Sequence, residues 1–525
     1  MRPGLGIDRV RGVIHSRGVG SSREDGEGHA GAAARGGASR GQGQGQRQVH
    51  LLAVPPRQVG GRRRLDAARP PGPRGHWLMG NVAEYERDRI GFLRRHHREF
   101  GDVFSFDERT VFTVDPRLAH QVLAATNREY VTEAAPFAGA SAPRDAGEFA
   151  GPWMRARRAL RGALGDDAAG EWDAAFLAAL DAALGRTAGR PVDVLPVMLG
   201  LAAETVAGLC LGADAAEVPE LLAVNHAALL PFEEASYQLP AWVPSRRNRR
   251  FFRAHGRMTE ALTRIVAARR AGAARSGGRD LLGVLLDARP ALSEREVTTT
   301  LWSLLIGGHG VPAAALTSLV RELALRPGLT AALASEAAQA AAAGEAPRNP
   351  GDPGAAESPE SDGTPESAGT PGTPGAGEGC PRARLPLAEA VVREVLRLSP
   401  PAWMLTRVAC VPAELGGWRL RPGDEVLLTA YLIHRDPRWW PRPDEFDPSR
   451  WDTAHPPPGA HLPFGSGPRY CPGSSVAMRQ LTLAASRIAQ RFHLDAPDAA
   501  ATVPAFSGRL APAGLRAAFR PRRPA

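Results

Sequence analysis

A ten-residue segment near the C-terminal end of the chain, 464–473, constrains the fold more than any other part. It reads Phe-Gly-Ser-Gly-Pro-Arg-Tyr-Cys-Pro-Gly, and apolar residues at 476–478 predict that a helix follows. Gly467 and Gly473 permit a tight backbone path, and the positive end of the helix would favour the thiolate form of Cys471. We therefore expect Cys471 to be a ligand in a turn before a helix; the alternative is a glycine-rich turn with an idle buried cysteine.

Length and composition indicate a folded protein. The 525 residues suffice for one large domain or for two to three ordinary ones, and a hydrophobic content of 43% is ample for a core. We find no run of about 18 or more apolar residues and no N-terminal signal pattern, so we expect a cytoplasmic protein without membrane insertion. The spacing of the cysteines predicts neither a zinc site nor a disulfide framework. These cysteines are Cys210, Cys380, Cys410 and Cys471.

The net charge of +10 suggests nucleic-acid binding at first sight, but its distribution argues against that function. All the basic residues counted in this charge are arginines, which fits a GC-rich coding sequence. Residues 1–64 hold twelve arginines against four acidic residues, a net charge of +8 that nearly equals the whole excess. We therefore expect no nucleic-acid partner.

Two stretches of low complexity divide the chain. Residues 1–64 are rich in Gly, Arg, Gln and Ser without apolar periodicity, which predicts a disordered tail. Residues 344–379 alternate Pro, Gly, Ser and Thr with seven acidic residues and one arginine, which predicts a flexible insert of net charge −6. The rest of 65–525 is predicted to form one domain that contains the insert.

Apolar periodicity places the secondary structure inside this domain. We expect a helix over 84–99, a hairpin over 103–114 and an almost entirely helical stretch over 152–340. A further helix is predicted over 385–398, before two prolines. A region rich in loops and strands then leads to the last long helix, after Gly473.

The segment around Cys471 resembles the heme-binding loop of the cytochrome P450 family, F-x-x-G-x-R-x-C-x-G. All five fixed positions match, at Phe464, Gly467, Arg469, Cys471 and Gly473. The resemblance covers roughly residues 70–343 and 380–525. It implies a mainly α fold, with a large helical domain and a small β-rich subdomain, and one heme b (iron protoporphyrin IX). It further implies that Cys471 is the axial iron ligand and that Phe464, Arg469 and Gly473 contact the heme, Arg469 at a propionate.

Two other segments extend the resemblance. Glu394 and Arg397 match the family's E-x-x-R helix behind the heme, and Arg450 lies in a segment similar to the one that supplies a second arginine. The resemblance implies that these three residues form a buried ion network. By itself, a Glu–Arg pair three residues apart is common on exposed helices and contributes little.

The resemblance implies further heme-binding residues before and after the helix that carries Glu394 and Arg397. Trp153 and Arg157 resemble the family's W-x-x-x-R, and Arg407 stands where another propionate-binding arginine is found. Each has the alternative of being an ordinary surface residue.

The helix that would cross the oxygen site departs from the family pattern A/G-G-x-D/E-T-T. The aligned residues are Gly307, Gly308, His309, Gly310 and Val311. The two small residues remain, but glycine replaces the acid and valine replaces the first threonine of the proton relay. Protons would then come from water, from the substrate's hydroxyls or from His309. The next residue is a proline, which should kink the helix.

The resemblance implies a heme-thiolate monooxygenase that inserts one oxygen atom from O2 into a small lipophilic metabolite, as in bacterial secondary metabolism. Electrons would come from a separate ferredoxin or flavodoxin-type partner and its NAD(P)H reductase, with Arg155, Arg158 and Arg161 as candidate docking residues. The substrate would bind near the loop over 130–150, which contains Phe137, Ala138 and Ala140. We expect a monomer.

The altered oxygen-site helix leaves two alternatives open: a heme-thiolate protein that catalyses peroxide-driven oxidation, rearrangement or coupling, and a non-catalytic heme- or ligand-binding relative.

Overall fold

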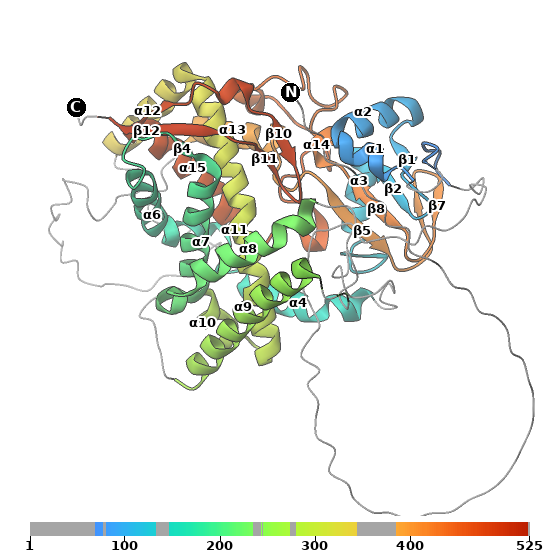
Figure 1. The fold of residues 1–525 in the computed structure, drawn as a ribbon, viewed down its shortest axis with the longest axis horizontal. Coiled ribbons are helices and arrows are strands. Elements are labelled where there is room, and N and C mark those ends of the chain that lie inside the picture. Colours follow the sequence, from blue (N-terminus) through green and yellow to red (C-terminus); the bar gives the residue numbers. More distant parts are fainter. Residues whose placement is uncertain are drawn as a thin grey trace, which may run out of the picture. The chain divides into compact units, whose positions relative to one another are not determined.

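The computed structural model describes residues 69–76, 80–132, 146–234, 243, 245–272, 280–343 and 385–522. The chain divides into two units, Met1–Arg47 and Gln48–Ala525, and all described residues belong to the second. The predicted tail, the whole of the predicted acidic insert and the loop residues Phe137, Ala138 and Ala140 lie outside the described residues. Figure 1 shows the arrangement of the elements.

Helices form most of the described chain. Two of them, α7 (Val194–Leu211) and α11 (Glu294–Leu325), make the most extensive contact between any two elements. One hydrophobic core lies between α11 and α6, α7, α12, α13 and α15. These are α6 (Asp173–Gly185), α12 (Pro327–Ala342), α13 (Pro386–Leu398) and α15 (Ser474–Arg491).

A second core lies on the other part of α7 and α11. It is built with α4 (Ala146–Leu160), α8 (Val218–Glu234), α9 (Arg246–Arg270) and α10 (Leu281–Leu286). The long helix α11 begins at a capping box, in which Ser293 caps Glu296 and the Glu296 carboxylate accepts from the Ser293 N–H. It continues as one helix through Pro312, whose missing N–H leaves the Gly308 carbonyl without its usual donor.

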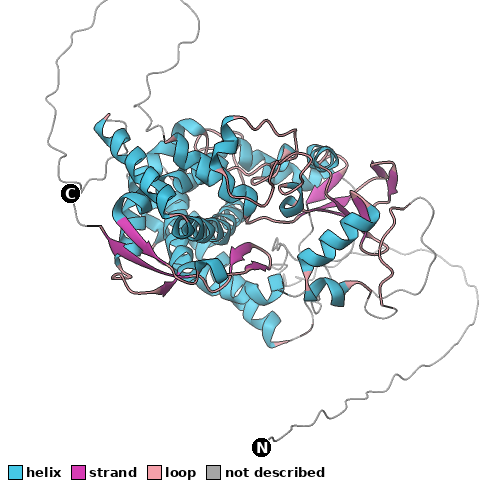
Figure 2. Cartoon of the chain, turned by 90° about the horizontal axis from the view of Figure 1, so that it is seen from above, coloured by secondary structure: helices cyan, strands magenta, loops and turns pink. Residues whose placement is uncertain are grey.

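The strands form small groups beside the helices, as Figure 2 shows. The largest sheet has the order β1-β2-β8-β5-β3, in which only β2 and β8 pair in parallel. It packs with three N-terminal helices, α1 (Val82–Arg87), α2 (Arg89–Phe100) and α3 (Pro116–Ala124). The strands are β1 (Val103–Ser105), β2 (Thr110–Thr113), β3 (Tyr130–Thr132), β5 (Leu405–Ala409) and β8 (Glu425–Leu428).

Three smaller sheets complete the fold, with the strand orders β4-β12-β9, β10-β11 and β6-β7. Their strands are β4 (Val192–Asp193), β6 (Ala413–Leu415), β7 (Trp418–Leu420), β9 (Phe492–Asp495), β10 (Pro504–Phe506), β11 (Leu510–Pro512) and β12 (Arg516–Pro521). The short helices are α5 (Asp166–Ala169) and α14 (Ala430–Ile433), with 3-10 turns η1 (Gly170–Trp172), η2 (Gly212–Ala215), η3 (Pro448–Asp452), η4 (Gly467–Arg469) and η5 (Ala499–Ala501).

The predicted architecture, mainly α with a small β-rich part, is confirmed. The hairpin expected over 103–114 is β1–β2, and the helix expected over 385–398 is α13. The prediction of one helix over 84–99 is wrong, because the chain breaks at Asp88 into α1 and α2. The Asp88 carboxylate accepts from the Gly91 N–H and so starts a new helix.

Two segments are long and apolar enough to span a membrane by composition: Val194–Ala215, which contains α7, and Glu294–Leu325, which is α11. In their most apolar windows, 50% and 61% of the residues are buried inside the fold. Core helices pass the same test.

Candidate functional site

The loop that carries Cys471 is held by backbone geometry that only glycine allows. Gly467 has a φ of +72°, and a Cβ there would lie 2.3 Å from the Leu123 carbonyl oxygen at the end of α3. The Cys471 N–H donates to the Phe464 carbonyl at 3.0 Å, which closes the loop. Gly473 then stands at the start of α15. The predicted turn before a helix is therefore present.

The environment of the Cys471 thiol contains opposing influences. Burial raises its pKa, whereas the Gly473 backbone N–H and the nearby Arg157 guanidinium lower it. Burial is the largest of these, so the pKa lies above its usual value. The Gly473 N–H at the start of α15 acts in the direction expected of the helix end, but burial outweighs it. A bound cation would supply the missing stabilisation of the anionic sulfur.

Three buried or half-buried arginines gather beside Cys471 from different parts of the chain. Arg157 comes from α4, Arg407 from β5 and Arg469 from η4. Burial, together with Arg469, lowers the pKa of Arg407 to about 10, and burial with Arg157 lowers that of Arg469 to about 10. Each guanidinium therefore feels its neighbour's positive charge, and all three remain protonated at neutral pH.

None of these arginines is paired with a carboxylate of the described residues. Arg407 donates to Thr126 Oγ1 at 2.9 Å, and Arg469 donates to Asn127 Oδ1 at 2.9 Å. Arg157 has a buried Nη1 with no hydrogen-bond partner in the part of the chain that the structure describes. Burying cations without a counterion is costly, so this cluster indicates a bound anion. Its position fits the two carboxylates of a heme whose iron faces Cys471.

Trp153 lies four residues before Arg157 on α4, hence on the same helix face, and is half-buried. Its position is consistent with the implied role beside a propionate. Phe464 is half-buried and packs against the core of α13 and α15. Phe464 therefore anchors the first residue of the cysteine loop to the core.

The predicted ion network is assembled. Glu394 accepts from Arg397 at 2.8 and 2.9 Å and from Arg450 Nε at 2.9 Å, and both Glu394 and Arg397 are completely buried. The same carboxylate accepts from the Asp447 N–H and from the Trp451 indole. The network therefore ties α13 to the segment that precedes the cysteine loop.

His434 continues this connection and was missed by the sequence reasoning. Its Nδ1 lies 3.1 Å from the Arg397 carbonyl, and its Nε2 accepts from the Leu462 N–H at 2.7 Å. Burial holds the pKa of His434 well below its ordinary value, so the ring is neutral. A neutral imidazole can accept at Nε2 and donate from Nδ1, which links α13 directly to the chain two residues before Phe464. No motif in the sequence marks this histidine.

The oxygen-site residues of α11 are divided between different faces of the helix. Gly307 is exposed with open space around its Cα, and Val311 lies on the same face one turn later. Gly308 packs on α7, where a Cβ would lie 2.5 Å from a Val206 methyl carbon. His309 is buried and points to the opposite side from Gly307 and Val311, since residues on a helix are about 100° apart. This orientation does not favour His309 as a proton relay.

Gly310 makes room for a guanidinium from another element. A Cβ on Gly310 would lie 2.1 Å from Nη1 of Arg509, which comes from the turn between β10 and β11. Arg509 also donates to His226 Nδ1 on α8 at 3.0 Å, and the His226 ring meets that of His309 edge-on at 5.3 Å. Burial and Arg509 lower the pKa of His226 to about 3 and of His309 to about 4, so both rings are neutral.

The Arg509 guanidinium, held by His226, therefore occupies the place of a side chain at position 310, where the family pattern has an acid. Both residues lie far from α11 along the chain and belong to no motif. The sequence signal in this region is the glycine at 310, which indicates a lost acid and does not reveal that another side chain takes its space.

The candidate docking arginines lie on the exposed side of α4 and just after it. Arg155 forms an ion pair with Glu296 of α11, with Nε–Oε1 at 3.1 Å. Arg158 and Arg161 are exposed, as is Tyr470 next to Cys471.

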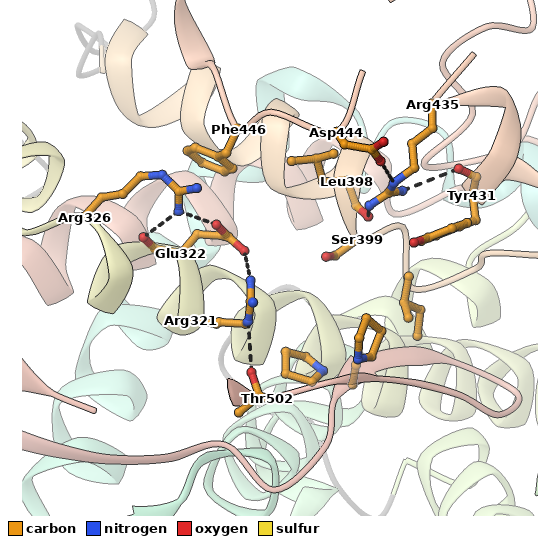
Figure 3. A pocket seen from close by; sticks show the side chains of 14 residues that line it. Arg321, Glu322, Arg326, Leu398, Ser399, Tyr431, Arg435, Asp444, Phe446 and Thr502 are labelled. Carbon is orange, nitrogen blue, oxygen red and sulfur yellow. Dashed lines mark hydrogen bonds and ion pairs between the residues drawn. The ribbon is translucent and has the colours of Figure 1, made fainter. Parts of the chain in front are cut away.

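A separate cavity of about 220 Å³ lies between the C-terminal ends of α11 and α13 and the β10–β11 hairpin (Figure 3). Its charged residues are paired with one another: Arg321 and Arg326 with Glu322, and Arg435 with Asp444 at 3.1 Å. None of the predicted heme-binding residues lines it. We interpret it as a junction of helix ends.

Comparisons with known proteins agree with this geometry. The sequence model of the cytochrome P450 family matches residues 70–349 and 381–511. Cyclooctatin synthase of Streptomyces melanosporofaciens is 32% identical over 327 residues, which are 59% of this chain and 63% of that protein. Cyclooctat-9-en-7-ol 5-monooxygenase of the same organism is 28% identical over 48% of this chain and 50% of its own. The matches thus span half to about two thirds of these relatives.

Solved structures show the same fold. A cyanobacterial CYP120A1 bound to retinoic acid has a TM-score of 0.68 at 20% identity, covering 86% of this chain and 99% of that one. The heme domain of cytochrome P450DA has a TM-score of 0.65 at 21% identity, covering 87% and 98%. The chain therefore belongs to the cytochrome P450 family, whose members are heme-thiolate proteins that bind heme b.

Proposed function

We propose that this protein is a monooxygenase that inserts one oxygen atom from O2 into a small lipophilic metabolite. The observation that carries the proposal is the cluster of Arg157, Arg407 and Arg469, without a described carboxylate partner, around a cysteine loop of the family's form. When bound through Cys471, heme supplies the activation of oxygen, which the electron-rich thiolate promotes. Phe464 and Gly473 would contact the heme, and the three arginines would hold its propionates.

The remaining roles belong to this chain's own residues. Glu394, Arg397 and Arg450 fix the segment before the cysteine loop, and His434 connects them to it. Gly307 and Val311 present a small, apolar surface on the face of α11 that is not packed against α7. No titratable side chain of α11 stands on that face between these two residues. Protons would therefore reach the site through water or from a hydroxyl group of the substrate.

The names of two relatives support the substrate class. They refer to cyclooctatin and to the oxidation of cyclooctat-9-en-7-ol, whose name denotes an alcohol. A lipophilic secondary metabolite that carries a hydroxyl group fits both this similarity and the absence of an acid at Gly310. The substrate would bind above Gly307 and Val311.

Electrons would come from a separate ferredoxin or flavodoxin-type protein and its NAD(P)H reductase. Arg158 and Arg161 lie exposed just beyond the heme-edge residue Arg157, where an acidic redox protein would approach. Arg155 is less suited, because Glu296 already pairs with it. We further propose a cytoplasmic monomer that does not bind nucleic acid or insert into a membrane.

The second candidate function is peroxide-driven oxidation, rearrangement or coupling. The observation that favours it is the replacement of the acid and threonine by Gly310 and Val311. Product formation should be compared with O2, NADPH and a redox chain on one side and hydrogen peroxide alone on the other. We expect product with the redox chain; product with peroxide only would support the second function, and ligand binding without any product would indicate a non-catalytic protein.

A further inference from the structure

The outer face of α9 carries five exposed arginines in one row. Apart from the adjacent pair Arg249 and Arg250, they are three or four residues apart, so they share one side of the helix and span about 16 Å at a rise of about 1.5 Å per residue. Together with Val224 of α8 and the buried Ala254 they line an open cleft of about 530 Å³. The arginine row consists of Arg246, Arg249, Arg250, Arg253 and Arg257.

None of the arginines in this row forms an ion pair with a described residue. The contrast with Arg264 further along the same helix is direct, because that arginine pairs with Glu217 of α8. Glu260 is exposed one turn after Arg257 but makes no ion pair with it. The row therefore presents a continuous positive surface to its surroundings.

This arrangement costs stability in the isolated protein. Like charges three or four residues apart repel one another on a helix. The row also begins in the first turn of α9, next to its N-cap Ser245, where the helix dipole is positive and acidic residues are normally favoured. An anionic partner would relieve both penalties at once.

The row favours a protein partner over a lipid surface. A membrane-binding helix inserts its apolar face, but the apolar face of α9, including Phe251, Met258 and Leu262, is buried in the core. Val224 is the one large hydrophobic residue of the cleft, with an exposed fraction of 37%. The length and spacing of the row match carboxylates at every third or fourth residue of a second helix, and guanidinium groups bind carboxylates in a fork-like geometry.

We propose that the arginine row on α9 is a docking site for an acidic protein that presents a helix with glutamate or aspartate along one face. This site is distinct from the surface around Arg158 and Arg161 on the side of the cysteine loop. It goes beyond the oxidation reaction and does not depend on it. Docking there would add a second protein contact, made by the helices that cover α11.

The test uses the full-length, heme-loaded protein and two synthetic helical peptides of identical composition. One peptide carries five glutamates on a single face, and the other distributes them around the helix. Arg249→Gln/Arg250→Gln/Arg253→Gln removes three charges from the row at little cost in helix propensity. The matched control, Arg87→Gln/Arg98→Gln/Arg190→Gln, removes three exposed charges that also lack ion pairs among the described residues.

We expect the one-faced peptide to bind more tightly than its isomer, with an affinity that falls as salt rises. The row variant should lose about tenfold in affinity, which three exposed pairs can supply, and the control variant should keep it. Circular dichroism and the heme spectrum establish that both variants are folded. Equal binding of the two peptides, or equal loss in both variants, would overturn the proposal. So would a row-dependent affinity for phosphatidylglycerol vesicles or duplex DNA without one for the peptide.

Discussion

At the scale of single residues, the site is recognised by charges that the protein itself does not balance. Burial lowers the pKa of Arg157, Arg407 and Arg469. Arg469 lowers the pKa of Arg407 further, Arg157 lowers that of Arg469, and one nitrogen of Arg157 is buried without a partner among the described residues. A protein tolerates such a cluster when a ligand completes it. The arginines and Cys471 together define where the two ends of a heme would lie.

Replacing Arg157 with glutamine should weaken heme binding by about ten- to a hundredfold, because one charge-assisted hydrogen bond to a carboxylate contributes about 1.5–3 kcal/mol. The same change removes a partly desolvated cation, so it should leave the stability of the heme-free protein unchanged or slightly higher. Heme titration and urea unfolding measure the two effects. Arg158→Gln, on the exposed side of α4, is the control and should change neither. A heme-free protein that is much less stable after Arg157→Gln would contradict the account.

Replacing Glu394 with glutamine should lower the free energy of unfolding by about 3–5 kcal/mol, because it leaves Arg397 and Arg450 buried without their counterion. The control is Glu389→Gln on the same helix, whose exposed pair with Arg393 should be worth less than about 1 kcal/mol. Urea denaturation of both variants gives the comparison. Similar values for the two would show that the buried network does not brace the loop.

The sequence predicted those residues that lie in short local motifs. Cys471 and its glycines occupy one continuous loop, so their spacing alone was informative. Glu394 and Arg397 share a helix face, and their spacing became informative only together with Arg450 and the family resemblance. Arg509, His226 and His434 were not predictable, because their roles arise only where separate elements meet. A single sequence contains no signal for such contacts.

At the scale of elements, α11 has one face that is open and other faces that pack closely against neighbouring side chains. Gly307 faces open space and Val311 is partly buried, whereas Gly308 and Gly310 permit close approach by Val206 and Arg509. The glycine that departs from the family pattern at position 310 therefore leaves the space that the Arg509 side chain of the β10–β11 turn occupies.

Gly310→Ala should destabilise the protein by about 1–3 kcal/mol, because its methyl group would overlap the Arg509 guanidinium. Adding Arg509→Ala should recover part of that loss, which a double-mutant cycle would show as a coupling of about 0.5–3 kcal/mol. Gly307→Ala is the matched control, since its methyl group meets nothing within 4 Å and alanine is the better helix former. Strict additivity of the two substitutions would show that Arg509 does not occupy this space.

The limits of prediction at this scale are visible in α1 and α2. The apolar periodicity of 84–99 continues across Asp88, so it could not reveal the break. The side chain of Asp88 caps a new helix, and this local hydrogen bond decides the boundary.

At the scale of the whole molecule, several buried histidines make stability depend on pH. Burial lowers the pKa of His226 and His461 to about 3 and of His255 and His309 to about 4, from 6.5. Below pH 6.5 the unfolded chain binds protons that the folded protein excludes. Folding should therefore lose stability as the pH falls from 6.5 toward 4.

The expected result is a lower urea midpoint at pH 5 than at pH 7, with each histidine contributing on the order of 1 kcal/mol. A variant with His255→Gln, which removes one of these groups without touching the cysteine loop, should show a smaller difference between the two pH values. An unchanged midpoint between pH 7 and pH 5 in the unmodified protein would contradict the burial of these rings.

The general fold was predictable because the resemblance to the cytochrome P450 family extends along most of the chain. Apolar periodicity also predicted the positions of most helices. The sequence did not predict whether acidic residues balance the charge of the arginine row on α9. A row of this kind is usually a solvated helix face. The structure supplies this information: Glu217 pairs with Arg264, and Glu260 forms no ion pair with Arg257. The arginine row is therefore left without an ion pair among the described residues.

The most direct test of the central claim is the ferrous carbon-monoxide difference spectrum of the purified protein, recorded beside Cys471→Ala. We predict the strongly red-shifted band of a thiolate-ligated heme in the unmodified protein and its loss in the variant. Failure to take up heme, or a band that persists without Cys471, would contradict the assignment of this cysteine as the iron ligand.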